Sequence, residues 1–192
     1  MSLDLIRAHF EGHQTTISCV AEKLSSTILQ TAEQISLALR QGGKVLVMGN
    51  GGSAADSQHF AAELVGRFLL ERKALPAIAL TTDTSILTAV ANDYGFDDVF
   101  SRQVQALANA GDIVIGISTS GCSINVRRGL AAARLLNCRT IALLGRNGGD
   151  IAKEVDIAMV VSVDETPYIQ EAHVTIIHIL CDLIEKKIFC QA

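Results

Sequence analysis

The stretch that most constrains the fold is an apolar run, a glycine-rich turn and a helical pattern over residues 44–67. Val45 to Met48 is short and apolar, which is typical of a buried parallel strand. The run stops at Gly49-Asn-Gly-Gly-Ser53, and beyond it Phe60 and Leu64 share one helix face. Such a turn can bind a phosphate group, because backbone N–H groups and the helix N-terminus both favour an anion. A tight turn without a ligand is the competing interpretation.

The turn matches neither the G-x-G-x-x-G nor the Walker pattern, so a nucleotide is not the expected ligand. Further along the same helix, His59 and Glu63 are four residues apart and therefore project from one face. Taken alone, this pair fits a helical salt bridge, half of a metal site or an acid/base pair. Its position just beyond a phosphate-type loop favours the last two.

Composition narrows the class of protein. The 192 residues are enough for one domain with a substantial core, and we expect a single domain over 1–192. The net charge of −4 predicts neither a nucleic-acid nor a membrane partner. No apolar run approaches transmembrane length and the first residues are charged and amphipathic, so a cytoplasmic location is expected.

Strand-like and helix-like segments alternate after residue 42. This alternation predicts an α/β fold with a doubly wound, five-stranded parallel sheet and right-handed crossovers. The expected strands are 45–48, 77–80, 113–117, 139–144 and 156–161. Beyond the helix that carries His59 and Glu63, the expected helices are 86–91, 97–107, 124–136 and 167–189.

Residues 3–41 read as helix and have no strand to pair with. Two apolar stripes with Ser25-Ser26 between them predict a helical hairpin, closed by Gly42-Gly43. We expect this hairpin, 1–41, to pack on a partner subunit, and 42–192 to form the α/β core.

A second loop, Ser118-Thr-Ser-Gly-Cys-Ser123, follows the strand 113–117 and opens the next helix. It offers hydroxyl donors as well as backbone N–H groups to an anion. Ligands of parallel sheets bind at the carboxyl ends of the strands, where this loop and the first turn should meet. The last helix is strongly apolar but carries Gln170, Glu171, His173 and His178. These polar groups are either satisfied within the core or used in a site.

On these motifs the chain resembles the phosphoheptose isomerases of the SIS (sugar isomerase) fold, which is flavodoxin-like. The resemblance runs over nearly the whole length. The matching segments are Gly49 to Arg67, Ala91-Asn-Asp-Tyr-Gly-Phe96, Gly116-Ile-Ser-Thr-Ser-Gly121, Ile169-Gln-Glu171 and Ile177-His178. Members convert sedoheptulose 7-phosphate to glycero-manno-heptose 7-phosphate, an early step towards the heptose of lipopolysaccharide.

The resemblance implies a role for each matching position. Glu63 is implied as the catalytic base and His178 as the catalytic acid. The implied substrate-binding residues are Asn50, Gly51, Gly52, Ser53, Glu63, Asn92, Asp93, Ser118, Thr119, Ser120, Ser123 and Gln170. One zinc ion per subunit would be held by His59, Glu63, Gln170 and His178. The family also implies a homotetramer with shared active sites and a phosphorylated heptose as substrate.

Isomerisation of a ketose to an aldose passes through an enediol and needs a base, an acid and a group that stabilises negative charge. Glu63, His178 and a zinc ion match these needs, although an amide oxygen is a weak zinc ligand and Glu63 would have two competing roles. Two positions depart from the family pattern, Cys122 and Pro167-Tyr168. The alternative is a non-catalytic SIS protein that binds the replication initiator, and the presence of Glu63 and both histidines favours the enzyme.

Overall fold

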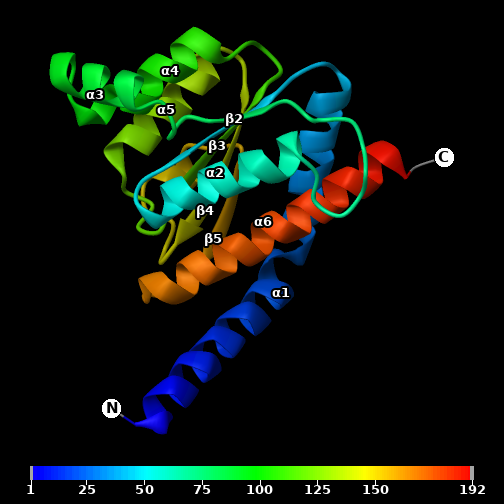
Figure 1. Cartoon of the computed structure of the whole chain (residues 1–192). Helices are drawn as coiled ribbons and strands as arrows, with labels where there is room; N and C mark the ends of the chain where they lie inside the picture. Colours follow the sequence, from blue (N-terminus) through cyan, green and yellow to red (C-terminus); the bar gives the residue numbers. More distant parts are fainter. Residues whose placement is uncertain (1, 191–192) are drawn as a thin grey trace.

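The computed structural model describes residues 2–190, and in it a parallel sheet lies between two layers of helices (Figure 1). The strands are β1 (Val45–Gly49), β2 (Ala77–Ala79), β3 (Ile113–Ser118), β4 (Arg139–Gly145) and β5 (Ile157–Val161). They lie in the order β2-β1-β3-β4-β5, and each neighbouring pair is parallel. The predicted five-stranded, doubly wound α/β fold is confirmed. The ends of the predicted domain, residue 1 and residues 191–192, lie outside the described residues.

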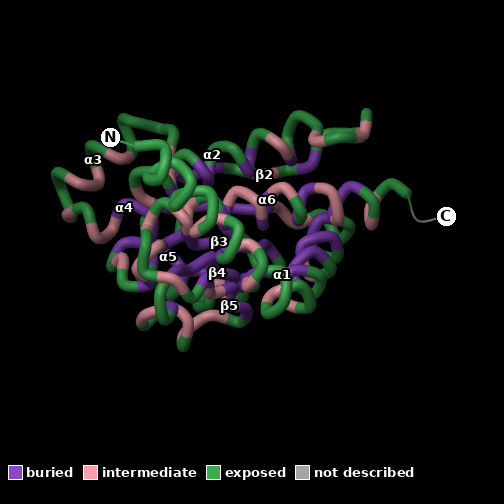
Figure 2. Tube along the Cα trace, turned by 90° about the horizontal axis from the view of Figure 1, so that it is seen from below, coloured by how far each residue is buried: buried purple, intermediate pink, exposed green. Residues whose placement is uncertain are grey.

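Side chains of each central strand alternate between two hydrophobic clusters, one on each face of the sheet. Val45 and Val47 of β1 pack with α1 (Leu3–Arg40), α2 (Gly52–Val65) and α6 (Thr166–Phe189). Leu46 and Met48 pack on the opposite side with α4 (Val99–Leu107) and α5 (Ile124–Leu135). Figure 2 shows the buried strands at the centre, with exposed segments around them. The remaining elements are α3 (Thr84–Asp93), η1 (Phe96–Asp98) and η2 (Ile151–Lys153).

The predicted N-terminal hairpin is wrong. Residues Leu3–Arg40 form one continuous helix of 38 residues, and the proposed break at Ser25-Ser26 lies in its interior. The Ser25 hydroxyl donates to the carbonyl oxygen of Ala21, one turn earlier, so this serine is accommodated without ending the helix. Gly and Pro, the residues that usually interrupt helices, are absent from the positions around it.

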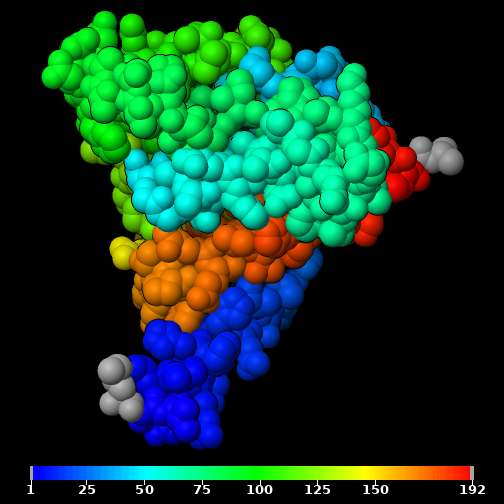
Figure 3. All heavy atoms as spheres, in the orientation of Figure 1, coloured from blue at the N-terminus to red at the C-terminus, as the bar shows by residue number. Residues whose placement is uncertain are grey.

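The two halves of α1 have different surroundings. The second half is part of the chain's own core: Ile28, Ala32 and Ile35 are buried and α1 packs along α6. The first half extends beyond the body of the molecule, beside the start of α6 (Figure 3). Leu3 and Phe10 there are 69% and 66% exposed. The first half thus has the more exposed apolar surface, and the packing of residues 3–41 between subunits stays a prediction.

The order of the strands places the site. β1 lies between β2 and β3, so the chain crosses to opposite sides of β1 and leaves a topological switch point between β1 and β3. Gly49 at the end of β1 pairs with Ile117 near the end of β3. The two loops that follow these strands therefore meet at one edge of the sheet. None of the helices formed by residues 2–190 combines the length and apolar character needed to cross a membrane.

Candidate active site

The first loop, residues 50–53, joins β1 to α2. Gly51 precedes the helix with a φ of 55°, a left-handed conformation that favours glycine and turns the chain sharply. Ser53 lies in the first turn and is buried. The backbone N–H groups at this helix N-terminus point towards the carboxyl edge of the sheet, as anion binding requires.

The second loop, residues 118–123, is organised by its own hydroxyl groups. Ser118 Oγ lies 2.9 Å from Ser123 Oγ and accepts a hydrogen bond from the Gly121 amide at 3.1 Å. Ser120 Oγ accepts from the Cys122 amide at 3.2 Å. Thr119 lies in the same loop and is partly exposed. These bonds gather hydroxyl groups and the N-terminus of α5 around one point, which suits a phosphate group.

A pair of side-chain amides connects the first loop to the first turn of α5, just after the second loop. Asn50 Nδ2 donates to Asn125 Oδ1, and Asn125 Nδ2 donates to Asn50 Oδ1, both at 2.9 Å. Asn125 is buried and was not among the predicted site residues. The reciprocal pair fixes the distance between the loops, which a ligand contacting both would require.

His59 and Glu63 of α2 meet His178 of α6. The Nε2 atoms of the two histidines are 2.8 Å apart, and Glu63 Oε1 lies 3.6 Å from His59 Nε2. Residues separated by more than a hundred positions thus form one cluster, towards the C-terminal end of α2 and about three helical turns from the first loop. His59 thus contacts both the predicted base, Glu63, and the predicted acid, His178.

Gln170 approaches the first loop from α6. A Cβ atom built on Gly52 would lie 2.3 Å from Gln170 Nε2, so the amide occupies the space that a side chain at position 52 would need. A side chain at position 52 would therefore displace the Gln170 amide. The amide of Gln170 thus lies against the predicted phosphate-type turn.

The donor chemistry of the histidine cluster suits zinc, which prefers imidazole nitrogen and carboxylate oxygen. Two nitrogen ligands of one tetrahedral zinc ion lie about 3.3 Å apart, given the usual zinc–nitrogen distance. The rings of His59 and His178 would have to separate slightly to reach that spacing. Accordingly, residues 2–190 contain no group of three or more His, Cys, Asp or Glu side chains already arranged to hold a metal ion.

Two predicted substrate residues lie apart from this cluster. Asn92 and Asp93 are exposed at the end of α3, which packs on η1 and α4. Asn92 Nδ2 donates to Asp93 Oδ1 at 2.8 Å. Within the described part of the chain, no hydrogen bond connects them to the histidine cluster.

Comparison with known proteins identifies the family. A model of the SIS domain matches residues 8–145. The phosphoheptose isomerase of Geotalea daltonii is 58% identical over 97% of this chain and 97% of its own length. The phosphoheptose isomerase of Geobacter sulfurreducens is 57% identical over 97% and 99%. This chain belongs to the phosphoheptose isomerase family of SIS-domain proteins. It is therefore an enzyme, an isomerase of phosphorylated sugars.

Solved phosphoheptose isomerases have the same fold. The structure from Francisella tularensis superposes with a TM-score of 0.94 at 42% identity, covering 97% of this chain and 99% of that one. The structure from Neisseria gonorrhoeae gives a TM-score of 0.92 at 46% identity, covering 96% and 98%.

The structure shows where the two departures from the isomerase family pattern, Tyr168 and Cys122, lie. The Tyr168 ring packs against α1, where a Cβ atom on Gly12 would lie 2.5 Å from its Cζ atom, and its hydroxyl is 3.5 Å from His9 Nδ1. Tyr168 thus joins the start of α6 to the projecting half of α1. Cys122 is exposed within the second loop, and its backbone amide takes part in the loop's hydrogen bonds.

Three further residues around the histidine cluster are not predicted from the sequence: Asp56, Phe68 and, one contact further away, Glu185. Asp56 is buried on α2, and one of its carboxylate oxygens has no hydrogen-bond partner. Burial raises the pKa of Asp56 to about 6, while His59 acts to lower it. Phe68 stacks on His178, and the buried Glu185 anchors the segment that carries Phe68. Asp56 could have been noticed as the charge on the apolar face of α2, one turn before Phe60. The contacts of Phe68 and Glu185 carry no sequence signal.

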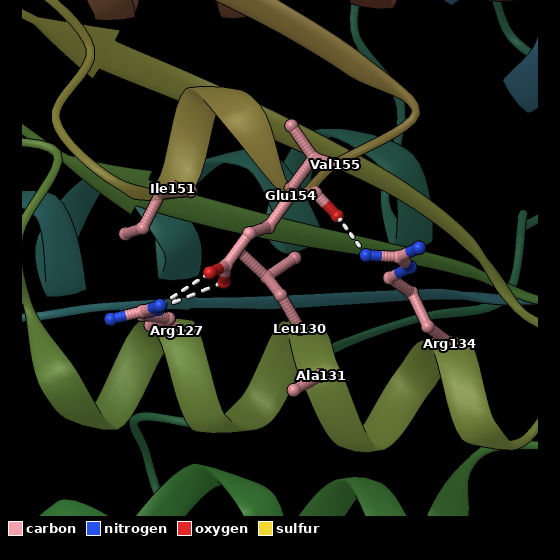
Figure 4. Close-up of a pocket in the computed structure, with 7 residues that line it drawn as sticks. All are labelled: Arg127, Leu130, Ala131, Arg134, Ile151, Glu154 and Val155. Carbon is pink, nitrogen blue, oxygen red and sulfur yellow. Dashed lines mark hydrogen bonds and ion pairs between the residues drawn. The ribbon is translucent and has the colours of Figure 1, made fainter.

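A small pocket elsewhere does not compete with this site. It lies between α5 and η2, among Arg127, Arg134 and Glu154 (Figure 4). Arg127 pairs with the Glu154 carboxylate, and Arg134 donates to the Glu154 carbonyl at 2.7 Å. Its charged groups therefore bind one another.

Proposed function

We propose that this enzyme converts D-sedoheptulose 7-phosphate to D-glycero-D-manno-heptose 7-phosphate. The observation that carries the proposal is the cluster in which His59 contacts both Glu63 and His178, in a chain that also has two loops suited to phosphate. The names of its relatives, phosphoheptose isomerases at 57–58% identity, agree with the choice of substrate. Production of heptose for lipopolysaccharide follows as the proposed pathway.

In the proposed mechanism, Glu63 accepts the proton from the carbon beside the carbonyl group. His178 donates a proton to the carbonyl oxygen, which yields an enediol, and reversal of the two transfers at the neighbouring atoms gives the aldose. Glu63 is partly buried and His178 is stacked beneath Phe68, so neither side chain is fully hydrated. Partial removal of water strengthens the charge interactions that such proton transfers need.

Substrate binding is assigned to the two loops. Ser118, Thr119, Ser120 and Ser123 surround the proposed phosphate position at the N-terminus of α5. Asn50, Gly51, Gly52, Ser53 and Gln170 are proposed to contact the sugar from the other side. Asn92 and Asp93 are proposed to reach the substrate of a neighbouring subunit, because they lie away from the cluster within their own chain.

We also propose that His59, Glu63, Gln170 and His178 hold one zinc ion per subunit. Two nitrogen donors already face each other, and the Glu63 carboxylate lies next to them. A zinc ion bound there would supply positive charge that stabilises the enediolate oxygens. The proposed assembly is a homotetramer with shared active sites, and the proposed location is the cytoplasm.

The test uses the purified full chain with sedoheptulose 7-phosphate and follows the aldose product, with and without a chelator. Glu63→Gln keeps the size of the side chain but removes the proton acceptor, so we expect kcat to fall ~100- to 10,000-fold. Glu154→Gln, on the opposite face of the sheet, is the matched control and should keep the wild-type kcat.

Exchange of the substrate C–H with deuterated water reports proton abstraction directly. If Glu63→Gln exchanges this proton at the wild-type rate, Glu63 is not the base. If the wild-type protein neither exchanges the proton nor isomerises the sugar, the proposed reaction is wrong and binding to the replication initiator becomes the alternative to test.

A further inference from the structure

The segment between α2 and β2 is held by a buried carboxylate. Residues 66–76 form neither helix nor strand, yet the backbone N–H groups of Phe68, Leu69 and Leu70 each donate to Glu185 at 2.9 Å. Glu185 lies near the end of α6 and is fully buried. Three successive amides bound to one carboxylate leave this part of the chain little freedom.

Arg72 completes the arrangement. Its Nε atom donates to Glu185 Oε1 at 2.9 Å, and its side chain is only 2% exposed. The other guanidinium nitrogens donate to the carbonyl oxygens of Glu63 at 2.8 Å and Leu64 at 2.7 Å. These carbonyls belong to the last turn of α2 and have no partner within the helix. Because both charges are paired and hydrogen-bonded, their burial is sustainable.

These bonds determine where the Phe68 ring lies. The ring stacks on His178, with centroids 5.4 Å apart and planes inclined by 27°. His59 lies on His178 as well, with ring centroids 5.1 Å apart. The imidazole of His178 is therefore confined by two rings. A phenyl ring offers no hydrogen-bonding group, so it restricts the imidazole without occupying either ring nitrogen.

The same buried pair touches both halves of the proposed acid/base machinery. Through the amide of residue 68 it fixes the ring over His178, and through the carbonyl of Glu63 it fixes the end of α2. The first contact comes from Glu185 on α6, the helix that carries His178, and the second comes from Arg72, which Glu185 binds. A change in the pair would thus move the acid relative to the base.

We propose that Phe68 is a positioning residue for His178 in the isomerisation, and that the Glu185–Arg72 pair keeps Phe68 in place. This inference rests on the proposed function, in which His178 is the acid. Phe68 holds the imidazole so that Nε2 points towards His59 and the substrate position. Glu185 and Arg72 act one step further away, through the backbone of residues 63–70.

The first experiment varies the ring. Phe68→Leu keeps an apolar side chain but removes the flat face, and we expect kcat to fall roughly 10- to 100-fold with KM within about twofold of wild type. Phe68→Tyr keeps the flat face and should restore kcat. Leu69→Ala is the matched control, because the Leu69 amide also binds Glu185 while its side chain is 63% exposed. It should behave as wild type.

The second experiment measures amide hydrogen exchange in the wild type and in Glu185→Gln. The amides of residues 68–70 should exchange slowly in the wild type, although they lie outside helices and strands, and at least roughly tenfold faster in the variant. Fast exchange of these amides in the wild type would overturn the role of Glu185.

The outcomes separate the two proposals. An active wild type with an equally active Phe68→Leu variant overturns the positioning role and leaves the proposed function intact. Equal losses in Phe68→Leu and Phe68→Tyr also overturn it, because the flat face would not be what matters. A wild type without isomerase activity overturns the proposed function, and the positioning role with it.

Discussion

Two fully buried ionisable residues of α6 are accommodated in opposite ways. Glu185 is charged and completely satisfied: burial alone would raise its pKa, but the amides of Phe68, Leu70 and Leu69, together with Arg72, lower it below the ordinary value. His173 has one partner, the Leu144 carbonyl at 3.1 Å, and its Nδ1 atom has none. The first residue is stable as an ion, whereas the second is stable only when neutral.

His173 should make stability depend on pH. Burial lowers its pKa from 6.5 to about 4, although the bond to Leu144 acts to raise it. Between these values the unfolded chain binds more protons than the native one, so stability falls as pH drops from about 6.5 towards 4. The contribution is at most roughly 3 kcal/mol. His173→Gln, which does not titrate, should lose less stability over this range in urea unfolding at pH 7.5 and 5.0. Equal losses in both proteins would contradict the assignment.

Some site residues were predictable because their relation is local. The spacing of His59 and Glu63 places them on one helix face, and Ser118 to Ser123 directly follow a buried strand. Others depend on contacts between distant segments. Asn125 pairs with Asn50 because β1 and β3 are neighbours in the sheet. Phe68 stacks on His178 while its backbone amide binds Glu185, which lies 117 residues away in the sequence. Spacing along the chain contains no record of such contacts.

At the scale of elements, apolar periodicity predicts the strands and the core helices, and their alternation along the chain predicts the parallel sheet. The predicted boundaries differ by small shifts: β5 begins at Ile157 because the Asp156 carboxylate accepts hydrogen bonds from Thr140. The prediction for α1 is wrong because a serine pair suits a helix N-cap as well as a helix interior. A serine in a helix interior can bond to the preceding turn, and only tertiary packing decides between the two states.

A proline in the middle of α1 tests its continuity. Ser26→Pro removes a helical hydrogen bond and should lower the free energy of unfolding by ~3 kcal/mol or more, with a loss of helical circular dichroism. Ser26 is exposed, so the cost would come from the backbone and not from packing. Ser26→Ala is the control and should be neutral or slightly stabilising. A hairpin with a turn at this point would tolerate the proline, so an unchanged stability would argue against one helix.

At the scale of the whole molecule, the first half of α1 presents an apolar surface and contacts the start of α6, which carries Gln170. Ile6 and Phe10 line a hollow with His9, His13 and Glu171. His13 Nδ1 lies 2.7 Å from Glu171 Oε2. Glu171 is the residue directly after Gln170 in α6. A second copy of the chain packed on this surface would therefore stabilise the start of α6, which carries one side of the proposed substrate pocket. Assembly and activity should depend on each other.

Phe10→Glu tests that dependence. Phe10 is 66% exposed in the single chain, so a charge there should not disturb the fold of one subunit. Within an interface the same charge would lose its water without gaining a partner, which is strongly unfavourable. We expect the wild type to sediment as a tetramer and the variant as smaller species with reduced kcat. Gln14→Glu adds the same charge at an exposed polar position and should remain tetrameric and active. A wild type that sediments as a fully active monomer would refute both the assembly and the shared site, because each chain would then complete its own active site.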